Sequence, residues 1–442
     1  MGKYFGTDGF RGRANEGLTA VHAFRTGRFL GHYFSKQGGR ARIVLGKDTR
    51  LSSYTLEYAL AAGAAASGAD VYLLHVTTTP SVSFVARTER FDCGVMISAS
   101  HNPYYDNGLK LVNGKGEKME ESVLEALEAY LDGGELPLAT GDKIGRTVDY
   151  VAGRNRYLAF LLSLPRTSFR GLKIGLDCAN GRAWAISKAV FDALGAQVFP
   201  IAAEPNGLNI NRGCGSTCIS RLQALVKEQS LDLGFAFDGD ADRCICVDER
   251  GEVLDGDGIL YVCARFLKAR GELDGNGVVC TVMSNLALSR CLEREGINCV
   301  AAPVGDKFVY GEMTEHGYSL GGEQSGHIIF RKYETTGDGI LTALMVTEIV
   351  LESKCPLSCL REGFQPFPQY LLNVPVKDKD EVLRSEKVRL AVRQAETLLA
   401  GGRVLVRPSG TEPLVRILVE GESESLCEEA ANIVARAAAE ED

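Results

Sequence analysis

The strongest constraint on the fold of this chain is a local pattern that occurs three times: an apolar strand, an amphipathic helix that ends at a glycine, and a second apolar strand. The first strands cover residues 41–46, 172–177 and 277–282, and the glycines are Gly68, Gly195 and Gly296. Glycine is typical of a helix C-terminus, because it adopts a left-handed conformation at little cost. Repeated strand–helix–strand units predict mixed, mostly parallel sheets with helices on both faces, and therefore three similar α/β domains.

The last part of the chain predicts a different fold. A charged helix over residues 379–399 precedes two strands, at 403–407 and 414–419, and a final helix. This order is typical of a small α+β domain with an antiparallel hairpin. A chain of 442 residues suggests about three or four domains, which we expect to surround a central cleft. The expected domains are 1–153, 154–252, 253–366 and 367–442.

Charge and composition exclude several classes of partner. The net charge of −8 argues against nucleic acid or an anionic membrane as the main partner. The 13 cysteines form no Cys-x-x-Cys pair, which is typical of reduced thiols in a cytoplasmic protein. Residues 1–8 contain no apolar core of signal-peptide length, and no uncharged apolar run reaches the length of a membrane span. We expect a cytoplasmic protein, either a monomer or a homodimer.

Three carboxylates at alternate positions, Asp238, Asp240 and Asp242, form the most informative motif. They can converge on one Mg²⁺ or Ca²⁺ ion if the backbone turns sharply between them, which the small residues at 239 and 241 permit. A calcium loop of the helix-loop-helix type is the nearest competitor. That loop needs glycine where Arg243 stands, and helices where this chain has apolar strands. An acidic turn that is merely solvated is a further alternative.

Ser100 follows an apolar strand that starts near residue 94 and ends abruptly in small polar residues. Ligands of doubly wound folds collect beyond the carboxyl ends of the strands, so Ser100 is a candidate nucleophile or phosphate carrier. His101 or Lys110 could shuttle its proton. A serine that only caps the next turn, beside a packed His101, fits these residues equally well.

Two further loops combine glycine with polar side chains. Residues 321–327 place Glu323 and Ser325 near glycines, which suits contact with sugar hydroxyls, although a plain surface turn has the same composition. Residues 407–413 join a cation, two hydroxyls and a glycine in a turn whose amides can hold an anion. A polar hairpin turn is the alternative there.

These motifs together resemble one protein family. Four segments stand in the order found in the α-D-phosphohexomutase superfamily and span nearly the whole chain: 97–103, 238–243, 321–327 and 407–413. Within it, the bacterial phosphoglucosamine mutase branch is similar at residues 5–9, Gln324 and residues 335–339. Arg212 and Cys218 depart from the acidic residue and the histidine expected at those positions.

The resemblance implies an isomerase that transfers a phosphoryl group. Ser100 would be carried as a phosphoserine and would complete a Mg²⁺ site with the three aspartates, while Arg243 adds a fixed cation. Lys110 and His101 would act as general acid and base. The implied reaction interconverts glucosamine 6-phosphate and glucosamine 1-phosphate, on the route to UDP-N-acetylglucosamine. It would be primed by glucosamine 1,6-bisphosphate or glucose 1,6-bisphosphate.

The resemblance also assigns side chains to the rest of the substrate. Sugar contacts would come from Lys307, Glu323, Ser325 and His327, and phosphate contacts from Arg407, Ser409, Gly410, Thr411 and Arg416. Thr7 and Arg11 would face the catalytic serine. The alternatives are a phosphoglucomutase or phosphomannomutase with the same machinery, or a noncatalytic sensor of sugar phosphates that depends on Mg²⁺.

Overall fold

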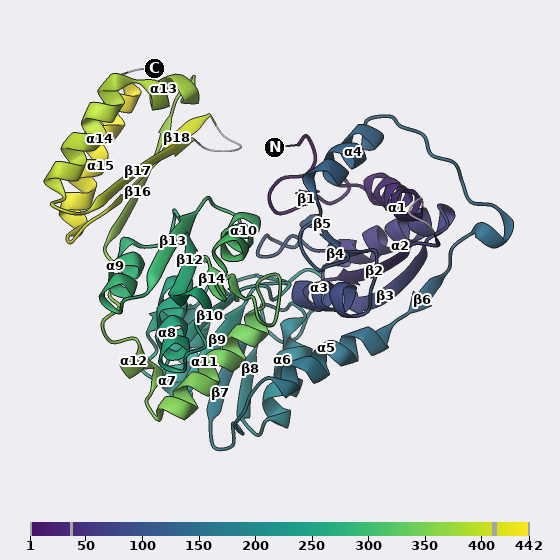
Figure 1. Ribbon diagram of the computed structural model, residues 1–442, viewed down its shortest axis with the longest axis horizontal. Helices are drawn as coiled ribbons and strands as arrows, with labels where there is room; N and C mark the ends of the chain where they lie inside the picture. The colour runs from purple at the N-terminus through teal and green to yellow at the C-terminus, as the bar shows by residue number, and fades with distance from the viewer. Residues whose placement is uncertain (1, 36–38, 409–412, 441–442) are drawn as a thin grey trace. The chain divides into compact units, whose positions relative to one another are not determined.

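The computed structural model describes residues 2–35, 39–408 and 413–440. The chain divides into two compact units: Met1–Met283 with Ile297–Arg361, and Ser284–Gly296 with Glu362–Asp442. The larger unit contains three sheets and the smaller unit one (Figure 1). Among the described residues, no helix combines the length and the apolar character needed to cross a membrane.

The first sheet of the larger unit has the strand order β1-β5-β4-β2-β3-β6. Its strands are β1 (Phe10–Arg13), β2 (Arg42–Lys47), β3 (Asp70–Val76), β4 (Cys93–Ile97), β5 (Asp106–Asn113) and β6 (Thr147–Asp149). The pairs among β2, β3, β4 and β6 are parallel, whereas β5 is antiparallel to β1 and β4. Apolar residues of α1 (Ala20–Ser35), α2 (Leu51–Ala66) and α4 (Glu121–Leu131) pack on one face in a single core. The opposite face carries α3 (Thr79–Thr88), which contacts α5 (Val151–Ser163) (Figure 1).

The second sheet has the order β11-β10-β9-β7-β8. Its strands are β7 (Lys173–Asp177), β8 (Gln197–Ile201), β9 (Leu233–Phe237), β10 (Cys244–Asp248) and β11 (Val253–Leu254), with helices α6 (Ala183–Ala193) and α7 (Ser220–Gln229). β7 is parallel to β8 and β9, and β10 is antiparallel to β9 and β11. Because β9 and β10 are buried along their whole length, the loop between them starts and ends inside the unit.

The third sheet has the order β13-β12-β14-β15. Its strands are β12 (Gly277–Thr281), β13 (Asn298–Ala302), β14 (Leu320–Gly322) and β15 (Ile328–Phe330), and the helices of this region are α8 (Gly256–Ala269), α10 (Asp306–His316), α11 (Gly339–Ser353) and α12 (Leu357–Leu360). β12 is parallel to β13 and β14, while β15 is antiparallel to β14. Short 3-10 helices cover Gly141–Lys143 and Asp274–Asn276.

The smaller unit is an antiparallel sheet covered by helices. Its order is β16-β18-β17, with strands β16 (Gln369–Pro375), β17 (Arg403–Pro408) and β18 (Leu414–Glu420), and helices α9 (Leu286–Arg294), α13 (Lys379–Arg384), α14 (Glu386–Leu398) and α15 (Glu424–Ala439). α14 and α15 lie side by side and share one hydrophobic core with the sheet (Figure 1).

The structure confirms the predicted fold class, three mostly parallel α/β layers and a C-terminal α+β part. Gly68, Gly195 and Gly296 all have positive φ just after a helix, as their sequence positions predict. The prediction of a single charged helix over 379–399 was wrong. The helical segment breaks at Ser385, whose hydroxyl accepts a hydrogen bond from the Val388 N–H and so starts α14 as a separate helix. The four domain boundaries stay a prediction.

Candidate active site

Ser100 lies in a loop that directly follows β4. Its φ is +51°, a left-handed conformation that residues with a side chain rarely adopt unless the surroundings hold them. Its N–H donates to the Ser98 hydroxyl at 3.0 Å. Its own Oγ donates to Asp238 Oδ2 at 2.5 Å and lies 3.3 Å from Nδ1 of His101. The fold thus brings this serine against the first aspartate of the acidic motif.

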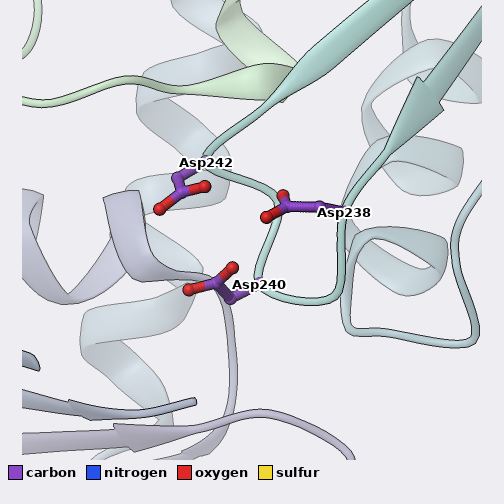
Figure 2. Close-up of side chains that lie close together, drawn as sticks. All are labelled: Asp238, Asp240 and Asp242. Carbon is purple, nitrogen blue, oxygen red and sulfur yellow. The ribbon is translucent and has the colours of Figure 1, made fainter. Parts of the chain in front are cut away.

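The aspartate loop connects β9 to β10. It turns through Ala241, whose φ is +58°. All three aspartates are buried, and each offers a carboxylate oxygen within 4.8 Å of the other two (Figure 2). The three carboxylates, which are separated by one residue each along the chain, therefore converge on one point.

Lys110, on β5, lies against this cluster. Its Nζ is 2.6 Å from Asp240 Oδ2 and 2.8 Å from Asp242 Oδ2. Burial disfavours the charge on Lys110, but the two carboxylates outweigh that effect and raise its pKa. Burial likewise disfavours the charge on Asp242, yet Lys110 and other neighbours hold the pKa of Asp242 well below its usual range.

Asp238 lies in a different electrostatic environment from Asp242. Burial, followed by repulsion from Asp242 and Asp240, raises the pKa of Asp238 well above its usual range. The cations around the cluster therefore do not fully balance the three carboxylates.

The donor set of this cluster fits a divalent metal ion. Oδ1 of Asp240 and Oδ1 of Asp242 are buried and accept no hydrogen bond from any residue that the structure describes. The other oxygen of Asp240 accepts a hydrogen bond from the Thr79 hydroxyl at 2.5 Å. Buried acceptors without a donor are unfavourable, and carboxylate oxygens are preferred ligands of hard divalent cations.

His101 and Arg243 contact each other beside Ser100. Nη1 of Arg243 donates to Nδ1 of His101 at 3.0 Å. Burial, then the positive charges of Arg243 and Arg11, lower the pKa of His101 to about 4. His101 is therefore a neutral imidazole whose Nδ1 already has a donor.

A cavity of about 950 Å³ opens beside Ser100, a volume within the range of small-ligand sites. Many of the residues singled out from the sequence line it together: Thr7, Arg11, Ser100, Lys110, Asp242, Arg243, Lys307, Glu323 and His327. Ser325 lies beside this wall, with its hydroxyl 3.4 Å from Glu323 Oε2. The cavity is thus lined by Ser100, by cations that include Lys110 and Arg243, and by the glycine-flanked loop of residues 321–327.

The polar side chains of that loop are oriented by backbone amides. The Gly305 N–H donates to Glu323 Oε1 at 3.1 Å, and the Gly337 N–H donates to Nε2 of His327 at 2.9 Å. Nδ1 of the same ring lies 3.9 Å from Asp242 Oδ1. His327 therefore places this loop next to the aspartate cluster.

Several residues at the site were missed by the sequence reasoning. Thr79 binds Asp240 through both its hydroxyl and its N–H, and Lys118 binds the Thr7 carbonyl at 2.5 Å and forms an ion pair with Asp306. Arg50 and Asn211 both donate to the Ser100 carbonyl. A signal existed for Thr79, because it follows an expected strand at the carboxyl edge of the sheet. Lys118 and Asn211 carry no comparable local signal.

The smaller unit brings two of the predicted phosphate-binding residues together. Arg407 on β17 and Arg416 on β18 are directly opposite each other in the antiparallel register. Burial and the charge of Arg416 lower the pKa of Arg407. Two like charges in this position repel each other, so the pair favours an anion beside it. Ser409, Gly410 and Thr411 lie outside the described residues.

Comparisons with known proteins cover nearly the whole chain. Models of the phosphoglucomutase/phosphomannomutase family match alpha/beta/alpha domain I at residues 2–137, domain II at 155–251, domain III at 255–367 and the C-terminal domain at 371–437. A phosphoglucosamine mutase of Lachnospira eligens is 59% identical over 97% of this chain and 96% of its own.

A second relative and a solved structure give the same picture. A phosphoglucosamine mutase of Lachnoclostridium phytofermentans is 55% identical over 98% of this chain and 97% of its own. The crystal structure of a phosphoglucomutase/phosphomannomutase family protein from Burkholderia thailandensis is 25% identical and superposes with a TM-score of 0.84, covering 99% of this chain and 97% of that one. The similarity therefore extends over all four sheets.

Proposed function

The chain belongs to the phosphoglucomutase/phosphomannomutase family, and from this membership we propose that it interconverts glucosamine 6-phosphate and glucosamine 1-phosphate. It is an isomerase of the mutase class, as its relatives of 55% and 59% identity are. The observation that supports the proposal most directly is the Ser100 hydroxyl, which donates to Asp238 at 2.5 Å on the wall of a cavity of about 950 Å³.

Ser100 is the proposed carrier of the phosphoryl group. Asp238, Asp240 and Asp242 would hold Mg²⁺, which when bound supplies positive charge to the phosphoryl group in transfer. Arg243 and Arg11 line the same cavity and keep fixed cations near Ser100. The serine, in its constrained backbone, presents one oxygen to the substrate in a defined direction.

Lys110 is the proposed proton carrier at the sugar hydroxyl, with His101 in an auxiliary role. Lys110 lines the cavity beside Ser100, whereas Nδ1 of His101 already accepts a hydrogen bond from Arg243. A proton carrier must reach the oxygen that gains or loses the proton. The geometry thus favours Lys110 over His101, although Nδ1 of His101 lies 3.3 Å from the Ser100 Oγ.

The remaining side chains are proposed to hold the sugar and its second phosphate. Glu323, Ser325, His327 and Lys307 would bind sugar hydroxyls, with Thr7 near the transferring group. Arg407 and Arg416, with Ser409, Gly410 and Thr411, would bind the phosphate that does not react. The proposed reaction passes through a bisphosphorylated sugar that turns over between two transfers, primed by glucosamine 1,6-bisphosphate or glucose 1,6-bisphosphate. We propose that the enzyme acts in the cytoplasm, as a monomer or homodimer, without nucleic acid or membrane as partner.

The first test compares substrates. Purified protein with Mg²⁺ and a trace of glucose 1,6-bisphosphate should show a kcat/KM for glucosamine phosphate at least about tenfold above the values for glucose and mannose phosphates. Phosphorus NMR follows the 1-phosphate and 6-phosphate directly. A preference for glucose or mannose phosphate would instead assign the protein a phosphoglucomutase or phosphomannomutase activity.

The second test concerns the serine. Ser100→Ala should lower kcat by at least about 10⁴-fold, because it removes the oxygen that would carry the phosphoryl group. Intact-mass analysis should show a phosphate-sized addition on the wild type that is absent from the variant. Ser187→Ala, which removes another buried hydroxyl, one that donates to the Ala183 carbonyl at 2.7 Å, should keep both the addition and the activity. An active Ser100→Ala protein would refute the phosphoserine route.

A further inference from the structure

The backbone of the serine loop is held by two side chains that do not line the cavity. Arg50 precedes α2, and Asn211 lies in the segment between β8 and α7. We propose that Arg50 and Asn211 are positioning residues that fix Ser100 in the conformation needed for phosphoryl transfer. The inference rests on the proposed function of Ser100, and it adds a second set of residues on which that function depends.

Arg50 contacts the loop from the interior of the protein. It is fully buried, and its Nη2 donates to the carbonyl of Ser100 at 3.1 Å and to that of Asn102 at 2.6 Å. Its Nη1 forms an ion pair with Asp48, which also accepts the Ser53 hydroxyl at 2.8 Å. A buried charge with a fixed partner and two carbonyl acceptors has little freedom to move, because each lost contact would leave a polar group unsatisfied.

Asn211 repeats the same pair of contacts from another part of the chain. Its Nδ2 donates to the Ser100 carbonyl at 2.8 Å and to the Asn102 carbonyl at 3.0 Å. Its own backbone has a φ of +58°, and its N–H donates to the carbonyl of Ala179 at 2.8 Å. The carbonyls of Ser100 and Asn102 therefore each receive two donors, one from Arg50 and one from Asn211.

The hydrogen bonds from Arg50 and Asn211, here called the clamp, account for the left-handed backbone conformation of Ser100. A left-handed serine would otherwise relax toward a more common conformation. Its N–H is held by Ser98 and its carbonyl by Arg50 and Asn211, so both backbone polar groups of the residue have fixed partners. The side chain is then the part of Ser100 that remains available to the cavity.

The clamp also abuts the aspartate loop. A Cβ added at Gly239 would come within 2.7 Å of the Ser100 carbonyl oxygen and 3.1 Å of Asn211 Nδ2. The serine loop and the metal loop therefore meet through the atoms that the clamp holds. A displacement of the Ser100 carbonyl would change the distance from the serine to the carboxylates, on which transfer depends steeply.

The test uses variants that remove or change the hydrogen-bond donors of Arg50 and Asn211. Asn211→Asp is nearly isosteric but replaces the donating amide by an acceptor that faces two carbonyls. Asn211→Gly removes the side chain and still permits the positive φ. Arg50→Lys keeps the charge beside Asp48 but lacks the planar fork. Thr49→Val is the matched control, because it removes a buried hydrogen bond, from Thr49 Oγ1 to the Asn180 carbonyl at 2.7 Å, one residue from Arg50.

Two measurements decide the proposal. We expect Asn211→Asp and Arg50→Lys to lower kcat by about 10- to 100-fold with KM within about threefold of wild type. Hydrogen exchange of the amides of residues 98–102, read by mass spectrometry, should become faster in the Asn211 variants and stay unchanged in Thr49→Val. If Arg50→Lys does not fold, the two Asn211 variants still carry the test.

The outcomes separate this inference from the proposed function. Unchanged kcat and exchange in the Asn211 variants would overturn the clamp while the mutase activity stands. Equal losses of kcat in Thr49→Val and in Asn211→Gly would assign Asn211 a general role in folding, which also overturns it. If the wild type lacks mutase activity, the proposed function fails, and the exchange measurement alone shows whether the clamp orders the loop.

Discussion

The serine loop and the aspartate loop are built alike and stabilised differently. Each follows a fully buried strand, β4 or β9, and each contains a residue other than glycine in the left-handed conformation, Ser100 or Ala241. In the serine loop, the backbone groups of Ser100 all have donors or acceptors from the protein itself. In the aspartate loop, two carboxylate oxygens have no donor among the residues that the structure describes.

The two loops differ in their side chains and not in how firmly their backbones are held. The backbone of the aspartate loop is also anchored, since Thr79 donates to the Asp240 carbonyl and Gly339 donates to the Ala241 carbonyl, both at 3.0 Å. What the protein leaves incomplete is the set of carboxylates. The backbone groups of Ser100 are therefore satisfied by the protein, whereas the aspartate loop leaves carboxylate oxygens that could bind a divalent cation.

The largest effect should come from the incomplete loop. Asp240→Asn removes a charged ligand, so we expect kcat to fall by about 100-fold or more and the Mg²⁺ concentration for half-maximal activity to rise. A metal titration of activity measures both. Asp177→Asn is the control, because Asp177 is also a buried carboxylate at a strand end but belongs to no possible metal-binding group of three among the residues that the structure describes. An unshifted titration in Asp240→Asn would argue against a metal on this loop.

An intermediate effect should come from the place where the loops touch. The Cβ of Gly239→Ala would meet the Ser100 carbonyl oxygen and Cδ1 of Ile210, each at 2.7 Å. We expect a loss of about 1–3 kcal/mol in the free energy of unfolding, and a fall in kcat of about tenfold, because the serine loop must move.

Chemical denaturation and steady-state kinetics measure the two losses. In Gly17→Ala, the new Cβ would meet no atom closer than 3.5 Å, and both quantities should stay near the wild-type values. If Gly239→Ala behaves as Gly17→Ala does, the two loops are not mechanically linked.

The sequence predicted the parts of the site that lie within one loop. The alternating aspartates and the serine after a strand are local patterns, and the fold places both at strand ends. The same is true of the α/β repeats, because strand–helix–strand order leaves few topologies. The split of the charged helix at Ser385 escaped prediction, because a capping serine inside a helical pattern has no distinct composition. β16 was missed for a related reason, since its pairing with β18 is non-local.

Contacts between distant segments could not be predicted. Asn211 lies 111 residues from Ser100, and Thr79 lies 161 residues from Asp240. The strand before Thr79 indicates only that it lies at the carboxyl edge of its sheet, and the local sequence of neither residue identifies its partner, because the contact exists only once separate sheets have packed. The supporting residues of a site are thus harder to predict than its reacting residues.

The smallest effect should be on the stability of Asp238→Asn, and its sign should change when Mg²⁺ is added. Burial, followed by repulsion from Asp242 and Asp240, raises the pKa of Asp238. Without metal, Asp238→Asn removes part of this repulsion, so the variant should be more stable than wild type by about 1–2 kcal/mol. With millimolar Mg²⁺ the order should reverse, because the wild type gains binding free energy that the variant loses.

Thermal unfolding in chelator and in Mg²⁺ measures both states of each protein. Ser187→Ala changes a residue outside the group of three aspartates and should show the same response to Mg²⁺ as the wild type. If Asp238→Asn is less stable than wild type even in chelator, the hydrogen bonds that Asp238 accepts from Ser100 and from the Arg243 N–H outweigh the repulsion. The aspartate loop would then be complete on its own, like the serine loop, and the contrast between the two loops would disappear.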